Sequence, residues 1–162
     1  KLNISNINFE KLQSKLPLFY IFLVFFQIMI GAFVSGMDAG TIYNSWPLMG
    51  TSYFPDDNNF SSLFKLSAFS EPSLVQFLHR NLAYLIFIFF LIIFIKIYRN
   101  KELFYLKKNI LTVFIFLTFQ IFLGIITVLS GATILYASLH QIGSILLLSI
   151  TLLLVYKNYK TN

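Results

Sequence analysis

The chain has 162 residues, of which 57% are hydrophobic and only 11% are charged. Soluble globular domains carry about 25% charged residues, so this composition excludes that class and predicts a protein that crosses a membrane several times. Cysteine is absent, which excludes disulfides, thiolate metal sites and thiol catalysis. The net charge of +6 does not indicate a nucleic-acid partner, because the basic residues gather just beyond apolar runs, where they set topology.

Four apolar runs are each long enough to cross a hydrocarbon core of about 30 Å at about 1.5 Å per residue. They cover residues 18–36, 74–97, 110–129 and 134–156. A polar juxtamembrane stretch at 1–16 is expected to lie on the membrane surface. We therefore predict an all-α membrane protein in which residues 1–162 form a single four-transmembrane-helix bundle. The chain begins with lysine rather than methionine, so we expect it to be a segment of a longer protein.

The two longer connections differ in charge. Residues 37–73 carry four acidic residues and one lysine, a net charge of −3, whereas residues 96–108 carry five basic residues and one acidic residue, a net charge of +4. The positive-inside rule puts the basic loop 98–109 and both termini on the cytoplasmic or matrix side, and the 37–73 loop on the opposite side. A loop as long as 37–73 in a compact bundle is more often functional than passive.

An internal repeat links the two halves of the chain. A glutamine precedes a glycine by four residues in the first and third runs, and a Leu-His pair lies near the start of the second and fourth. We interpret the bundle as two copies of a helical hairpin, because parallel repeats of this kind place a binding site between the halves. We expect the two glutamines to form interhelical hydrogen bonds. The residues of the repeat are Gln27, Gly31, His79, Gln120, Gly124 and His140.

His79 and His140 are the only two histidines. Each lies a few residues inside an apolar run, where an ionisable side chain is costly and indicates function. Counted from Leu74 and Ile134, both lie roughly 8–9 Å inside the outer boundary. If a two-fold axis relates the hairpins, the imidazoles face each other across it, and they could bind the iron of a haem from both faces of the macrocycle.

The surroundings of the histidines favour such a cofactor. Ala83 lies four residues after His79, while Gly143 and Ser144 lie three and four after His140, and these small side chains would leave room for a porphyrin. Arg80 lies close to the outer interface and has two open roles: pairing with a haem propionate, or reaching the lipid headgroups.

Other uses of two histidines fit less well. Zinc and copper sites need three or four ligands, and the spans contain neither cysteine nor a mid-membrane carboxylate. Proton relays usually recruit aspartate or glutamate inside the spans. The remaining alternative is structural, with each histidine hydrogen-bonded to a neighbouring helix.

Three motifs extend beyond the histidines: GAFVSGMDAGTIYNSWPLMG at residues 31–50, VQFLHR at 75–80 and LHQ at 139–141. Together they resemble the haem A synthases of the mitochondrial and alphaproteobacterial type, and the first motif is long and specific. The likeness covers roughly residues 27–145. It is a likeness to the carboxy-terminal half of that family only.

The resemblance implies an eight-span enzyme of two four-helix halves, which oxidises a methyl group of haem O to the formyl group of haem A for cytochrome oxidase. In the family, the second half holds a haem b between two histidines, which correspond to His79 and His140. We therefore expect iron ligation by these two residues, with Arg80 as a further cofactor-binding residue, and an electron-relay role for this segment. No residue is assigned as catalytic, because the family's substrate-haem half is not part of the likeness.

The resemblance also implies partners and location. We expect the haem O substrate to bind in the other half, and membrane lipid to surround the bundle. Haem O synthase, cytochrome oxidase assembly proteins and a second copy of the chain are candidate protein partners. The membrane would be a bacterial plasma membrane or a mitochondrial inner membrane.

Two other functions remain open from the sequence. One is a stand-alone membrane b-type cytochrome that exchanges electrons with quinol. The other is a cofactor-free bundle for assembly or transport. Four further spans with another histidine pair, encoded upstream, would favour the synthase over both.

Overall fold

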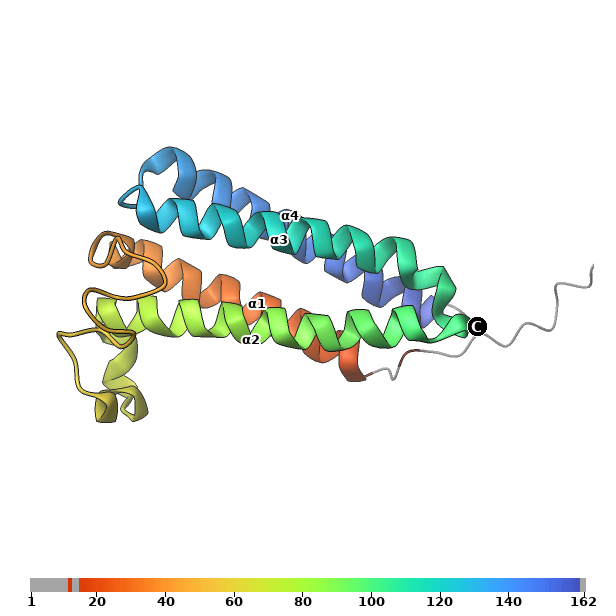
Figure 1. The fold of residues 1–162 in the computed structure, drawn as a ribbon, viewed down its shortest axis with the longest axis horizontal. Helices are drawn as coiled ribbons and strands as arrows, with labels where there is room; N and C mark the ends of the chain where they lie inside the picture. The colour runs from red at the N-terminus through yellow and green to blue at the C-terminus, as the bar shows by residue number, and fades with distance from the viewer. Residues whose placement is uncertain (1–11, 13–14, 161–162) are drawn as a thin grey trace, which may run out of the picture.

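The computed structural model describes residues 12 and 15–160, and most of the 1–16 stretch expected at the membrane surface lies outside them. Within the described residues the chain forms four long helices and no β-strand. These helices are α1 (Lys15–Gly36), α2 (Pro72–Arg99), α3 (Lys107–Leu129) and α4 (Ile134–Lys160). Figure 1 shows them side by side as two hairpins, α1 with α2 and α3 with α4. The predicted all-α four-helix membrane bundle is confirmed.

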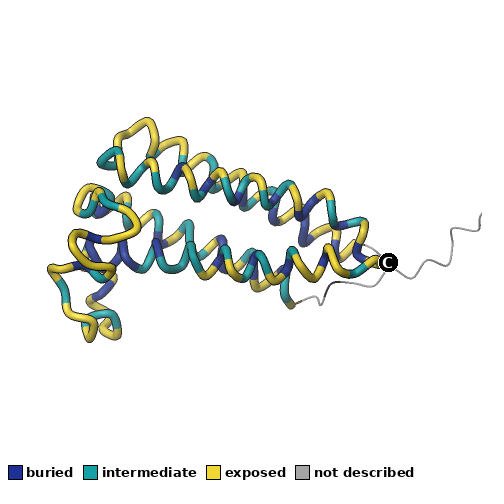
Figure 2. Tube along the Cα trace, viewed as in Figure 1, coloured by how far each residue is buried: buried dark blue, intermediate teal, exposed yellow. Residues whose placement is uncertain are grey.

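The helices are long and apolar enough to cross a membrane, and each of the four runs proposed from the sequence lies inside one of them. Their outer faces carry large apolar side chains, such as Phe22, Ile88 and Phe122, each about 60% exposed. Such exposure would be costly in water but is expected where lipid is the solvent. The chain is an integral membrane protein, and exposed and buried positions alternate along each helix accordingly (Figure 2).

Local chemistry explains where the helices begin and end. Pro72 occupies the first turn of α2, where the missing N–H of proline leaves no intrahelical bond unmade. Between α3 and α4 the backbone turns through Gly131 and Ala132, which both have positive φ. Their amide groups donate to the carbonyl groups of Val128 and Thr127, so the last turn of α3 is closed by hydrogen bonds.

The four long helices pack in a ring. Helix α1 contacts α2 and α4, and α3 contacts α4 and α2. Helices α2 and α4, which carry the two histidines, therefore lie diagonally across the bundle. A buried apolar cluster fills the end nearest the basic loop, where α2 contributes Ile86, Phe90, Ile93 and Ile97 at helical spacing. The outer end, at the level of the histidines, lies beyond this cluster.

The basic end is also held by polar contacts. Asn158 is 1% exposed; its side chain accepts from the Leu12 amide at 3.1 Å and donates to the Leu12 carbonyl at 3.3 Å. Lys157 donates to Asn109 on α3 at 3.0 Å. At the outer end the hairpins meet through Gln141, whose amide lies 3.3 Å from the Ser35 hydroxyl. The two hairpins are thus joined at both ends.

The loop between α1 and α2 is ordered by its own hydrogen bonds. It contains three short 3₁₀ helices: η2 (Ala39–Thr41), η3 (Phe60–Phe64) and η4 (Leu66–Ser70). The Asp56 carboxylate accepts from the Ser52 hydroxyl at 2.7 Å, and from the Thr51 amide and hydroxyl at 3.0 Å. Gly50 has φ of 83°, and a Cβ there would clash with Asp56. The loop is therefore a folded cap and more than a solvated connector.

The Asp56 contacts predict a pH dependence of this cap. Hydrogen bonds from Ser52 and Thr51 lower the pKa of Asp56 below its ordinary value. Since the folded pKa is below the unfolded one, the stabilisation is complete above about pH 4 and is lost as pH falls through the folded value. Protection of the Thr51 amide from hydrogen exchange, corrected for intrinsic rates, should fall in that acidic range. In Asp56→Asn the protection should be low already at neutral pH and insensitive to acid; an unchanged acid-dependent loss would contradict the assignment.

Candidate cofactor site between the hairpins

The two histidines meet inside the bundle. His79 lies two turns into α2 and His140 two turns into α4, and their ring centroids are 6.4 Å apart with planes at 79°. Because α2 and α4 are diagonal, the rings face each other across the bundle axis. The sequence predicted this meeting from the matching depths of the two residues. Their role as iron ligands stays a prediction.

Each histidine is held by the glutamine of its own hairpin. The Gln27 amide nitrogen lies 3.2 Å from His79 Nε2 and donates to the His79 carbonyl at 3.0 Å. The Gln120 amide nitrogen lies 3.0 Å from His140 Nδ1 and donates to the His140 carbonyl. The predicted interhelical hydrogen bonds are confirmed. Each one restricts the position of an imidazole relative to the neighbouring helix.

Two glycines make room for the rings. A Cβ added to Gly31 would lie 3.0 Å from Cε1 of His79, and one added to Gly124 would lie 3.0 Å from Cε1 of His140. This is tighter than almost any ordinary side-chain contact, so glycine lets each histidine lie directly against the backbone of the partner helix. Sequence reasoning recognised these glycines as part of the repeat but missed this role. Their spacing of one helical turn from the glutamines was the available signal.

The small residues singled out beside His140 have other neighbours. A Cβ on Gly143 would clash with the Gln120 side chain, so Gly143 makes room for that glutamine. The Ser144 hydroxyl donates to the Gln141 carbonyl on its own helix at 2.7 Å. Gly143 is therefore explained by the Gln120 side chain beside it. Room for a porphyrin along Ala83, Gly143 and Ser144 stays a prediction.

The spacing of the two rings fits a metal ion shared between them. Two imidazoles bound to one metal ion at about 2 Å each would have centroids about 6 Å apart, close to the observed 6.4 Å. His79 Nδ1 and the side-chain oxygens of Gln27 and Gln120 are buried and lack hydrogen-bond partners among the described residues, so polar capacity remains at the site. Among the described residues, no three or more His, Cys, Asp or Glu side chains lie close enough together to hold a metal ion. Two axial ligands are the donor set that a haem iron takes.

Arg80 binds the loop above the histidines. It is 9% exposed, and its guanidinium donates to the carbonyls of Tyr43 at 2.8 Å, Ser45 at 2.9 Å and Leu48 at 3.3 Å. Gln76, one turn earlier on α2, donates to the same Tyr43 carbonyl at 3.0 Å. Sequence reasoning missed this role, because nothing in the local sequence shows where the loop carbonyls lie.

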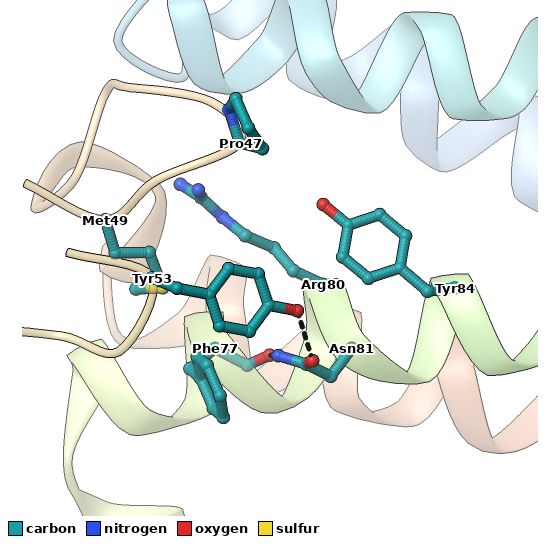
Figure 3. Close-up of a pocket in the computed structure, with 7 residues that line it drawn as sticks. All are labelled: Pro47, Met49, Tyr53, Phe77, Arg80, Asn81 and Tyr84. Atoms are coloured by element: carbon teal, nitrogen blue, oxygen red, sulfur yellow. Dashed lines mark hydrogen bonds between the residues drawn. The ribbon is translucent and has the colours of Figure 1, made fainter.

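A small pocket lies beside Arg80 on the outer side (Figure 3). The Tyr53 hydroxyl donates to Asn81 at 2.6 Å, and the Trp46 indole donates to the Tyr84 hydroxyl at 3.0 Å. Burial raises the pKa of Tyr53 above its ordinary value. The lining residues are Pro47, Met49, Tyr53, Phe77, Arg80, Asn81 and Tyr84.

Comparison with known proteins identifies the family. The COX15-CtaA family model, described as cytochrome oxidase assembly protein, matches residues 6–152. The chain belongs to this family. The match includes both histidines, both glutamines, and the two glycines that make room for the rings, Gly31 and Gly124.

Curated relatives support the same assignment. A protein named heme A synthase from Pelagibacter ubique is 50% identical over 153 residues, which are 92% of this chain and 45% of the relative. Proteins of that name from Rickettsia felis and Paracoccus denitrificans are 41% and 35% identical, over 84% and 80% of this chain and 41% and 34% of their own lengths. The chain thus spans less than half the length of these relatives. No solved structure matches it significantly.

The Arg80 contacts predict that the loop depends on this side chain. In Arg80→Met the carbonyls of Tyr43, Ser45 and Leu48 lose charged hydrogen bonds, so opening of the loop should become easier by about 1.5–3 kcal/mol. Hydrogen exchange of residues 43–50 in lipid nanodiscs measures this opening. Arg80→Lys is the matched control: it keeps the charge but cannot reach several carbonyls with one planar fork, and should give an intermediate result. Equal exchange in all three proteins would contradict the bonding role.

Proposed function

We propose that this chain is the cofactor-haem half of a haem A synthase, in which His79 and His140 bind the iron of a haem b and relay electrons. The observation that carries the proposal is the 6.4 Å separation of the two imidazole rings across the bundle axis. Family membership and the names of the relatives support it. The reaction would be conversion of haem O to haem A for cytochrome oxidase, by oxidation of a methyl to a formyl group.

The residues suit electron transfer more than oxygen activation. His79 and His140 would hold the haem iron between them, and a haem held in this way would supply one-electron chemistry here. Gln27 and Gln120 hold the two rings against a second helix through their amide nitrogens, which contact His79 and His140. Substrate haem O would bind in the part of the relatives that this chain does not match. Haem O synthase, oxidase assembly proteins and a second copy of this chain remain candidate partners.

We infer from the charge difference between the loops that the basic end faces the cytoplasm or matrix, which puts the histidines near the opposite surface. Arg80 as a propionate partner stays a prediction: its Nη atoms are bound to loop carbonyls, and its Nε is buried without a partner among the described residues.

The first test replaces the ligands. Purified His79→Ala/His140→Ala protein should keep its helical content but lose the optical spectrum of a low-spin b-type haem, because no axial ligand remains. Haem content per chain, by pyridine haemochrome assay, should fall to background. Wild-type protein without such a haem, or a double variant with an unchanged spectrum, would defeat the proposal.

The wild-type protein and the double histidine variant also distinguish the alternative functions. A cofactor-free bundle would remain folded without any haem. A stand-alone cytochrome would hold the haem and exchange electrons with quinol. If this chain were fused to the segments of a relative that it does not match, the fusion protein would then form no haem A. Formation of haem A in that fusion protein, lost in the double histidine variant, supports the synthase.

The second test uses the glycines. Gly31→Ala and Gly124→Ala should each displace an imidazole from its place against the neighbouring helix and weaken haem binding by about 10–100-fold, the usual effect of disturbing the support of a metal ligand. Gly36→Ala is the matched control on α1, because a Cβ there meets nothing within 4 Å. Titration of the apoprotein with haem measures the affinity. Equal haem affinities in the Gly31 and Gly36 variants would show that the close approach of Gly31 does not position His79.

A further inference from the structure

The outer loop carries an exposed apolar ridge on η3 and η4. Phe60 is 63% exposed, Phe64 82%, Leu66 91% and Phe69 40%. Lys65 lies between the two most exposed members. Contiguous apolar surface of this kind marks a contact with lipid or with another molecule. The ridge lies outside the helices that cross the membrane, so the surface of the spans does not account for it.

The ridge is fixed to the start of α2. The Asn58 amide donates to the Ser73 hydroxyl in the first turn of α2 at 2.8 Å. Phe60 packs on Phe54 at a centroid distance of 5.7 Å, and Phe54 packs edge-to-face on Phe77 of α2 at 5.1 Å. The height of the ridge relative to the spans is therefore set by the point where α2 begins.

The ridge is continuous with the lipid-facing surface of the bundle. The ring of Phe69 lies 6.4 Å from the ring of Phe33, which is in the last turn of α1 and is 48% exposed. Figure 1 shows this segment projecting sideways from the outer end of the α1–α2 hairpin, away from α3 and α4. A segment in this place extends along the plane in which the spans end.

We propose that the ridge inserts into the outer interface of the lipid bilayer, with Phe64 and Leu66 at the boundary of the acyl chains and Lys65 among the phosphates. Apolar side chains inserted a few ångströms below the headgroups gain burial energy. A lysine beside them places its methylene stem along the apolar surface and its ammonium group in the headgroup layer. The ridge would hold the loop that binds Arg80 at a fixed height above the bilayer. This proposal does not depend on the haem.

The absence of cysteine from the chain allows a direct test. Single-cysteine variants F64C and L66C, spin-labelled and reconstituted into nanodiscs of phosphatidylcholine and phosphatidylglycerol, report collisions with lipid-soluble O₂ and with a water-soluble nickel chelate. F122C, at an exposed site on α3, is the lipid reference. N59C is the aqueous reference, since Asn59 is exposed in the same loop and makes no side-chain cap bond.

Labels at 64 and 66 should show an O₂-to-nickel collision ratio several-fold above that of N59C and approaching that of F122C. A ratio equal to that of N59C would place the ridge in water and overturn the proposal. Low collision rates with both reagents would indicate that protein, either a second copy or another chain, covers the ridge, and would also overturn it. Repeating the measurement in this chain fused to the segments of a relative that it does not match tests whether those segments displace the lipid.

Discussion

The site depends on a hydrogen bond between a glutamine and a histidine, made once in each hairpin. An imidazole inside a membrane is costly unless its polar atoms are paired. The amide groups of Gln27 and Gln120 contact both the ring and the carbonyl of their histidines, which fixes each ring relative to a second helix. Gly31 and Gly124 then allow the rings to lie against the backbone. Because both hairpins use the same device, the rings meet near the axis.

The rest of the bundle keeps this arrangement in place from both ends. The apolar cluster and the Asn158 contacts close the basic end, so the hairpins cannot separate there. At the outer end, Arg80 ties α2 to three carbonyls of the loop. A buried guanidinium needs several acceptors, and a folded loop can supply them where lipid cannot. The loop is thus part of the site's support.

Sequence reasoning predicted much of this arrangement. The lengths of the apolar runs predict the four helices, since a membrane span has a narrow range of lengths. The matching depths of His79 and His140 predict that they meet. The bonding role of Gln27 and Gln120 follows from how rarely glutamine occurs in such helices. These inferences use only spacing along one helix, or symmetry between two.

The features that sequence reasoning missed depend on distances between segments. Gly31 and Gly124 were visible in the repeat, but their contact with the histidines depends on how closely the two helices of a hairpin approach. Gly143 was assigned to a cofactor pocket, and its contact with the Gln120 side chain, which crosses from α3, was missed. The partners of Arg80 depend on the fold of a loop whose conformation no periodic pattern describes.

The most direct test of the central claim uses the fact that the chain has two histidines. Protein labelled with ¹⁵N only in histidine, holding ferric haem, should give a low-spin electron paramagnetic resonance signal with hyperfine couplings from two axial imidazole nitrogens. Coupling from one imidazole, from none, or a high-spin signal would contradict ligation by both His79 and His140.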